Sequence, residues 1–281
     1  MSSAASIPAN RGAIAVPGKH FLRNLVERRM LIYQLVRRDF EQRFVGSAAG
    51  WLWGLIHPLV MLASWVFVFQ WCLHTKLPAN EVTQSYSLFL FCGFLPWMLF
   101  QETVQRSATA LLDHSNLIKK TVFPAEIVPV SIFLSSLLNH LLALGLLLVV
   151  VGVYVGHFSM WMFSLPIYMV LIGLFAVGIG WIVSSLQVYL RDTAQVLSVV
   201  MTLWFWITPI FIDEQQFPAS VRFLLHANPL AFVVRAYRDR LLSYRNPSLT
   251  ELAIVTAYAV SVFLLGGLFF RHLKRGFADV L

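Results

Sequence analysis

The segment from Gly12 to His20, GAIAVPGKH, is the part of the chain that comes nearest to a nucleotide-binding loop. A P-loop has four residues between its two glycines and a Ser or Thr after its Lys, because its backbone cradles phosphates and the hydroxyl binds Mg²⁺. Here five residues separate the glycines, and His20 replaces the hydroxyl. The sequence has no other glycine-rich phosphate loop. Any ATP-driven function of this chain therefore requires a separate ATPase subunit.

Metal and nucleophilic chemistry find little support in the residue spacing. The eight histidines form no HExxH or similar pattern, and no Ser, His and Asp set follows from their order. Cys72 and Cys92 both lie within apolar runs, which favours reduced, buried thiols. We predict no metal site, no cofactor bound by this chain and no enzymatic activity.

Several polar residues stand within or beside long apolar stretches. Polar groups at membrane depth usually face a pathway or form hydrogen bonds with a neighbouring helix, and the sequence leaves both roles open. Glu102 can also reach cytosolic water from the end of its helix. The residues are His57, Glu102, Asn139, His140 and Gln187.

The composition defines the elements that must position these residues. Hydrophobic residues make up 58% of the 281 residues and charged residues 12%, against ~45–50% and ~25% in soluble domains. The 23 Phe, 9 Trp and 8 Tyr also exclude a disordered or collagen-like chain. The net charge of +8 does not indicate nucleic-acid binding, because most basic residues flank apolar stretches. The sequence predicts an all-α integral membrane protein.

Stretches without Asp, Glu, Lys or Arg locate the membrane spans. The longest, Ile127 to Leu190, has 64 residues and would measure roughly 95 Å as one helix, so it must fold back. We expect the break near Gly156 and Pro166. Six transmembrane helices result, at about 51–73, 83–105, 127–155, 164–190, 193–212 and 252–270.

The distribution of basic residues predicts the orientation of these spans. An even number of spans places both termini on one side, and fifteen of the 21 Lys and Arg residues lie on that side. Both termini are therefore expected in the cytosol. No cleaved signal is expected, because Ala13 to Val16 is the only apolar patch at the start. Residues 1–19 are expected to form a disordered tail.

Residues 20–45, before the first span, mix apolar and basic residues at helical spacing. This pattern predicts an amphipathic helix on the inner leaflet, with its basic side toward anionic headgroups. A solvated basic helix is the alternative. The basic residues assigned to this helix are Arg28, Arg29, Arg37 and Arg38.

The connection before the last span contains twelve uncharged residues, Phe223 to Val234, interrupted by Asn228 and Pro229. This run is too short to cross a ~30 Å hydrocarbon core. We interpret it as one or two re-entrant or interfacial half-helices, which would mark the outer mouth of a pathway. Five arginines in this connection lie on the predicted outer side: Arg222, Arg235, Arg238, Arg240 and Arg245.

Several segments together resemble the ABC transporter type-2 permeases, in particular the exporters of O-antigen, capsule and teichoic acid. They are VRRDFEQRFVGSAAGWLWGLIHPL (36–59), CGFLPWMLF (92–100), NLIKKTVFPAEIVPV (116–130), YLRDTAQVL (189–197), WFWITPIF (204–211) and NPLAFVVRAYRDRLL (228–242). The resemblance spans about residues 20–275. It implies a transmembrane domain over 46–275 with a cytosolic end at 276–281. It also implies a homodimer that lies in the bacterial inner (plasma) membrane and contacts its lipids. This homodimer would bind two ATPase subunits, which hold ATP and Mg²⁺.

The resemblance assigns roles to three segments. Phe21 to Phe44 corresponds to the interface helix, and 215–230 to external gate helices. The candidate gate residues are Phe217, Asn228, Pro229, Arg235 and Arg238. The short amphipathic segment that Pro124 ends corresponds to the coupling helix for the ATPase, through Asn116, Leu117, Ile118, Lys119, Lys120, Phe123 and Pro124.

The resemblance implies a lipid-linked glycan as cargo, and most closely O-antigen. Flat aromatic rings can pack against the C–H faces of sugars, although interface belts and helix packing also use them. The arginines near the gate could attract phosphate or acidic sugars, or contact headgroups. Another cargo, such as a drug or small lipid, and an enzyme acting on polyprenyl-linked sugars are the alternatives. Candidate pathway residues are Trp65, Phe67, Trp97, Phe100, Glu102, Trp204 and Trp206.

Overall fold

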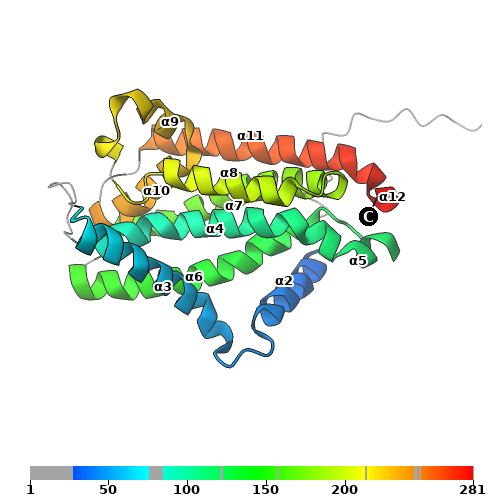
Figure 1. Ribbon diagram of the computed structural model, residues 1–281, viewed down its shortest axis with the longest axis horizontal. Helices are drawn as coiled ribbons and strands as arrows, with labels where there is room; N and C mark the ends of the chain where they lie inside the picture. Colours follow the sequence, from blue (N-terminus) through cyan, green and yellow to red (C-terminus); the bar gives the residue numbers. More distant parts are fainter. Residues whose placement is uncertain are drawn as a thin grey trace, which may run out of the picture.

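Figure 1 shows the computed structural model, which describes residues 28–75, 85–120, 123–156, 158–212, 214–243, 246 and 248–280. All regular elements within these residues are helices. Five helices are long and apolar enough to cross a membrane: Gly50–Cys72, Tyr86–Asp113, Ile127–Val155, Met160–Tyr189 and Leu249–Gly276. The prediction of an all-helical membrane protein is confirmed. The predicted tail (1–19) and the start of the predicted interface helix (20–27) lie outside the described residues.

The long helices run side by side along the long axis of the molecule (Figure 1). They are α4 (Tyr86–Asp113), α6 (Ile127–Val155), α7 (Leu165–Tyr189), α8 (Thr193–Ile207) and α11 (Leu249–Leu273). The first span, α3 (Trp53–Val66), begins after the 3₁₀ turn Gly50–Leu52, continues into the π-helical turn Phe67–Cys72 and crosses the others at an angle. The predicted fold-back after α6 is confirmed, because Gly156 ends that helix with φ 78° and Met160–Ser164 forms a 3₁₀ turn before α7.

Shorter helices lie at the ends of this bundle. They are α2 (Arg29–Phe44), α5 (Ser115–Lys120), α9 (Arg222–Ala227), α10 (Pro229–Arg238) and α12 (Phe277–Val280). Further short turns are Glu214–Gln216, Ala219–Val221, Asp239–Ser243 and Lys274–Gly276. Helices α5 and α12 lie at one end of the bundle, and α9 and α10 lie at the other (Figure 1). Two short helices, α9 and α10, lie where the sequence predicted half-helices around Asn228 and Pro229.

The core of the chain is built on α4 and α7, which pack against each other and are buried on most sides. Trp97 and Phe100 of α4 are fully buried, and Phe100 stacks on Phe175 of α7 with 5.4 Å between ring centroids. Helix α10, at the end of the bundle opposite α5, also packs against this core. Its residues Leu230 and Val233 are buried in the same cluster as Trp97 and Phe100. By contrast, Pro58 is the only buried residue of α3 in the single chain.

Helix α8 is shorter than the predicted span at 193–212. It ends at Ile207, because Thr208 precedes Pro209 and takes an extended backbone, which a residue before proline favours. Its 15 residues measure about 22 Å, less than a ~30 Å hydrocarbon core. The structure therefore leaves this helix out of the five long candidate spans.

The described part of the predicted interface helix is α2. Its residues Ile32 and Leu35 are buried against a cluster that includes Ile127 and Leu134 at the start of α6. Arg29, Arg37 and Arg38 are exposed, and Arg28 is partly exposed. One side of α2 thus packs on protein, while its basic residues remain available to solvent or headgroups.

Helices α7 and α11 touch through a pair of glycines, and we expect Gly266→Val to separate them. A Cβ atom at Gly266 would stand 2.2 Å from the Gly178 carbonyl oxygen, which is backbone and cannot turn away. Small residues allow this kind of close helix approach in membranes. The expected loss is about 2 kcal/mol of unfolding free energy, measured as a lower thermal midpoint in detergent. Gly145→Val, where an added Cβ meets nothing within 4 Å, is the control, and an equal loss in both variants would contradict this account.

Candidate functional site

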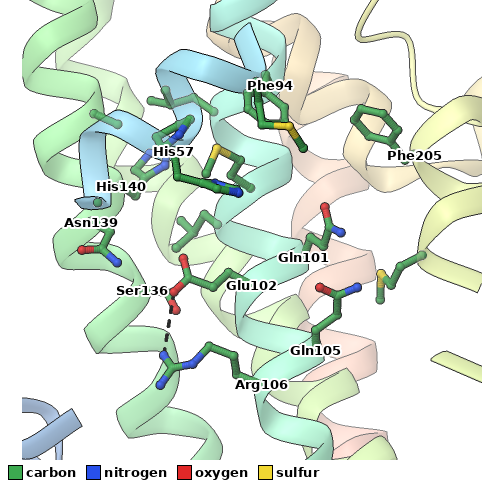
Figure 2. Close-up of a pocket in the computed structure, with 18 of the residues that line it drawn as sticks. His57, Phe94, Gln101, Glu102, Gln105, Arg106, Ser136, Asn139, His140 and Phe205 are labelled. Carbon is green, nitrogen blue, oxygen red and sulfur yellow. Dashed lines mark ion pairs between the residues drawn. The ribbon is translucent and has the colours of Figure 1, made fainter. Parts of the chain in front are cut away.

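A cavity of about 500 Å³ lies between α3, α4, α6 and α8, next to the last turn of α2 (Figure 2). Helix α4 supplies one wall, because Phe94, Met98, Gln101 and Gln105 recur every three or four residues and share a face. The wall changes from apolar to polar toward the end of α4 that leads to α5. The cavity therefore combines an aromatic part with a polar part.

Aromatic rings from three helices form the apolar part. Trp65 of α3 meets Phe94 of α4 edge-on at 4.4 Å and Phe205 of α8 at 5.3 Å between centroids. Phe211, just after α8, packs against Trp65 as well, at 5.2 Å. Ring faces of this kind suit apolar C–H surfaces.

Two polar atoms in the polar part are buried without a hydrogen bond in the described structure: Asn139 Oδ1 and Arg106 Nη1, the second of which lies 3.8 Å from Glu102 Oε1 in an ion pair. One accepts hydrogen bonds and the other donates them. A hydroxyl group can do both, so this part of the cavity suits a hydroxylated ligand. Gln101 and Gln105 add amide groups that can serve either way.

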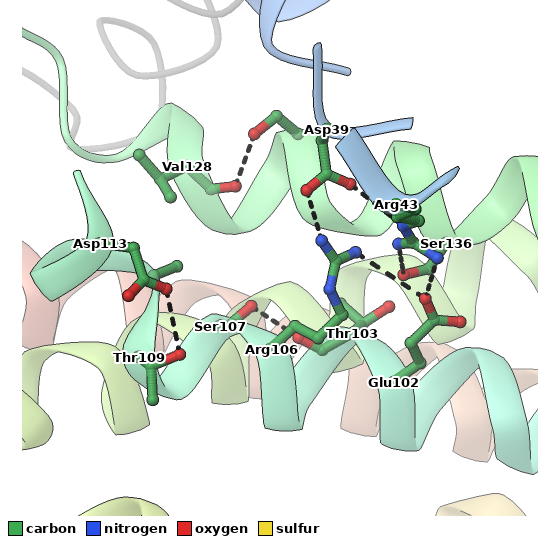
Figure 3. Close-up of polar contacts among 12 residues, drawn as sticks. Asp39, Arg43, Glu102, Thr103, Arg106, Ser107, Thr109, Asp113, Val128 and Ser136 are labelled. Carbon is green, nitrogen blue, oxygen red and sulfur yellow. Dashed lines mark hydrogen bonds and ion pairs between the residues drawn. The ribbon is translucent and has the colours of Figure 1, made fainter. Parts of the chain in front are cut away.

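A network of ion pairs fastens the end of α2 to the polar part of the cavity (Figure 3). Arg43 pairs with Glu102 and donates to Ser136 of α6 at 3.4 Å. Asp39 pairs with Arg106 and, at 3.4 Å, with Arg43. Because two cations face two anions, the network is electrically balanced. It joins α2, α4 and α6 at the edge of the cavity.

The predicted pathway residues fall into three groups. Trp65 and Glu102 line the cavity. Trp97 and Phe100 are fully buried in the core of the single chain instead. Trp204 is half-buried and donates from Nε1 to Asn228 at 2.9 Å, whereas Phe67 and Trp206 are exposed by 58% and 57%.

The structure places the intramembrane polar residues in two kinds of surroundings. His57 and Asn139 line the cavity, as Glu102 does. His140 also lines it, but its Nε2 is hydrogen-bonded to the Tyr237 hydroxyl of α10 at 3.0 Å. Gln187 has a helix-joining role, because it donates to the Arg191 carbonyl and accepts from the Ala194 amide at the turn between α7 and α8.

Asn228 joins the two half-helices to the end of α8. Its Oδ1 accepts from the Leu230 amide at 3.0 Å, which caps α10. Its Nδ2 donates to Thr208 at 3.0 Å, and Pro229 occupies the first position of α10, where no amide hydrogen is needed. Phe217, another candidate gate residue, is partly buried before α9, and its carbonyl accepts from Arg222.

Arg238 is buried and donates to three backbone carbonyl groups, one in the first turn of α4 and two just after the end of α8. It donates to the carbonyls of Phe89 (3.2 Å), Pro209 (2.7 Å) and Ile210 (2.6 Å). The guanidinium also lies 3.5 Å from the Phe89 ring centroid. Its donor groups therefore bind the backbone of the chain itself. The sequence had instead suggested that this arginine attracts phosphate or acidic sugars, or contacts headgroups.

The other described arginines of this region also have partners within the chain. Arg240 is 2% exposed and bonds the hydroxyls of Ser164 and Tyr168. Arg235 forms ion pairs with Glu214 and Glu251. Burial of Arg235 would lower its pKa, but its bonds to these two carboxylates outweigh burial and raise the pKa, so it stays charged. Arg245 lies outside the described residues.

The segment assigned to coupling lies at the opposite end of the bundle. Helix α5 covers Ser115–Lys120 and exposes the side chains of Asn116 and Lys119, while Leu117 is partly buried. Ile118 and Phe123 pack inward against a cluster at the ends of α4 and α6, and Pro124 is buried. The predicted coupling residues thus divide into an exposed and an inward-facing set.

The chain is a bundle of apolar helices around a cavity that is aromatic in one part and polar in the other, an arrangement that fits a membrane transport protein. The chain belongs to the ABC-2 type transporter family, whose pattern matches residues 30–242.

Proteins that carry an export function in their names are similar to this chain. One is the O-antigen export system permease protein RfbA of Myxococcus xanthus, which is 29% identical over 261 residues, 92% of this chain and 98% of the relative. RfbA proteins of Klebsiella pneumoniae are 26% identical over 253 residues and 27% identical over 254 residues. Each of these matches covers 89% of this chain and 95% of the relative.

Proposed function

We propose that this chain is the permease subunit of an ATP-driven exporter that moves a lipid-linked glycan of the O-antigen class across the bacterial inner membrane. Family membership and the names of the relatives support this function. The cavity is the observation that carries it. Its aromatic part offers ring faces to sugars, and its polar part holds an acceptor, Asn139 Oδ1, that has no partner in the described structure.

The proposed topology has six crossings with both termini in the cytosol. Helix α8 is the fifth crossing, completed by the irregular residues 208–212 and the half-helices that follow. Because α5 and α12 lie at the same end of the bundle (Figure 1), an even number of crossings fits the described chain. That end carries Lys119, Arg271, Lys274 and Arg275, as expected for a cytosolic face.

The proposed pathway runs along the seam of a homodimer. Helices α3 and α8 each contribute to the cavity and leave large apolar surfaces uncovered, such as Trp71 (69% exposed) and Leu203 (60% exposed). A second copy would cover part of these surfaces. The glycan would pass between the protomers, while its polyprenyl tail stays in lipid, which it prefers by ~0.8 kcal/mol per CH₂ group.

The proposed energy source is a pair of ATPase subunits that hold ATP and Mg²⁺. Helix α5 provides the contact, since Asn116 and Lys119 point away from the bundle. Closure of the ATPases would then act on α4 and α6, which flank α5 and line the cavity.

Filling the cavity tests this function in cells that depend on the chain for surface glycan. Asn139→Trp places a large ring in the cavity and is expected to lower export about tenfold or more, so that lipid-linked glycan accumulates inside. Leu141→Trp is the matched control, because Leu141 is 46% exposed on the same helix and does not line the cavity. Wild-type surface glycan with Asn139→Trp, or in cells without the chain, would contradict the proposal.

A further inference from the structure

The end of the chain lies against the connection between α4 and α6. We call the described residues of this connection, 115–120 and 123–126, the α5 segment. After α11, the turn Lys274–Gly276 places the Lys274 ammonium 2.5 Å from a carboxylate oxygen of Glu126. Glu126 immediately precedes α6, and its backbone carbonyl accepts from Trp181 Nε1 of α7 at 3.0 Å. One residue at the end of the α5 segment is thus held by α7 and by the C-terminal turn.

An apolar cluster reinforces this contact. Phe277, at the start of α12, is 1% exposed and shares a cluster with Leu111 of α4 and with Val128 of α6. Ile118 and Phe123, the inward-facing residues of the α5 segment, pack against the same cluster. The C-terminal residues and the coupling segment therefore share one small core, separate from the core that surrounds the cavity.

The C-terminal turn is in turn fixed to the end of α7. The Tyr189 hydroxyl donates to the Leu273 carbonyl at 2.9 Å, and the Tyr189 ring packs against Phe277. A Cβ atom at Gly276 would stand 2.6 Å from the Tyr189 hydroxyl oxygen, so a larger residue there would displace that hydroxyl. Movement of the turn independently of α7 would break these contacts.

In this arrangement Lys274 is the charged partner of the Glu126 carboxylate. Its side chain is 13% exposed, so loss of a charged partner would leave a carboxylate poorly hydrated. Its position at the amino end of α6 favours negative charge, and Lys274 supplies the nearby positive charge. Removing or reversing the Lys274 charge would therefore disturb the point where the α5 segment passes into α6.

We propose that residues 274–280 position the α5 segment for productive contact with the ATPase subunit, with Lys274 as the positioning residue. This inference rests on the proposed function. Because Lys274 pairs with Glu126 and Phe277 belongs to the cluster against which Ile118 and Phe123 pack, a push on α5 moves α4, α6 and α7 instead of turning α5 in place. The C-terminal segment is thus part of the coupling apparatus.

Charge reversal and charge exchange test this role in the full complex of permease and ATPase. Lys274→Glu is expected to leave ATPase association within about threefold but to lower the glycan exported per ATP hydrolysed about fivefold or more. Glu126→Lys should do the same, and the double variant should recover most of the ratio. Lys274→Met, which loses the charge without repulsion, should give a smaller decrease. Arg275→Glu, at an exposed neighbouring residue, is the matched control and should keep the wild-type ratio.

The ratio separates positioning from simple stabilisation. An unchanged ratio in Lys274→Glu, a loss of folded permease without a change in the ratio, or no recovery in the double variant would overturn the inference. Failure of the wild-type complex to bind an ATPase or to export glycan would instead count against the proposed function, which distinguishes the two.

Discussion

Arg238→Met is expected to lower the free energy of unfolding by about 3 kcal/mol, because it removes the side chain that donates to three carbonyl groups, two of which lie outside any helix. Those carbonyls belong to α4 and to the residues after α8, so a single side chain ties these two elements to α10. Water at membrane depth is scarce, and the open carbonyls of Pro209 and Ile210 have few other donors. The measurement is the thermal midpoint of the purified permease, with size-exclusion chromatography after heating as the readout of folded protein.

Two variants make this test specific. Arg238→Lys keeps the charge but loses the planar fork that reaches several acceptors, so an intermediate loss is expected. Arg38→Met removes an exposed arginine from α2 and should leave the midpoint unchanged. A midpoint for Arg238→Met equal to that of Arg38→Met would show that the carbonyl contacts contribute nothing measurable.

The double change Asn116→Asp and Lys119→Glu is expected to weaken ATPase association about a hundredfold. Both side chains are exposed on α5, so the change alters the contact surface by two negative charges and the loss of one positive charge without altering the core. Phe123 is less suitable for this test, because it packs against internal clusters and its replacement would also disturb the fold. The measurement is the amount of ATPase retained by affinity-captured permease.

A matched pair of changes at the other end of the bundle supplies the control. Gln216→Asp with Arg222→Glu alters two exposed or partly exposed positions near α9, on the side where no ATPase is expected. ATPase retention should stay at the wild-type level there. If the α5 variant retains ATPase at the wild-type level, α5 does not form the contact, and the proposed route of coupling is wrong.

The helical frame could be predicted because a bilayer imposes strict rules on sequence. Charge-free runs had to be helices, and the run from Ile127 to Leu190 was too long for one crossing. Gly156 and the Asn228–Pro229 pair marked chain breaks, and the structure places helix ends at both. The end of α8 was predicted less well, because Pro209 ends the helix inside an otherwise apolar run.

The cavity could be predicted only in part, because α4 is apolar on most of its sides. Gln101 faces the cavity, whereas Trp97, one turn earlier, is buried and donates to the Gln101 side chain at 2.6 Å. Hydrophobicity alone does not tell which side of α4 faces the cavity and which side faces the core. The unpaired Asn139 oxygen likewise depends on where α6 lies relative to α4, which no local pattern shows.

The arginine contacts lay beyond local sequence patterns for the same reason. Arg238 finds its acceptors 28, 29 and 149 residues away along the chain. Lys274 and Glu126 are 148 residues apart. The only sequence signal for the Arg238 contacts was an excess of arginines on the side where a membrane protein usually has few.

ATP-dependent export by reconstituted complexes tests the central claim most directly. Permease and ATPase would be placed together in lipid vesicles with lipid-linked glycan, and the glycan reaching the far leaflet would be measured with and without ATP. The account predicts transfer only when permease, ATPase and ATP are all present, and no ATP hydrolysis by the permease alone. Hydrolysis by the isolated chain, or equal transfer without the ATPase, would contradict it.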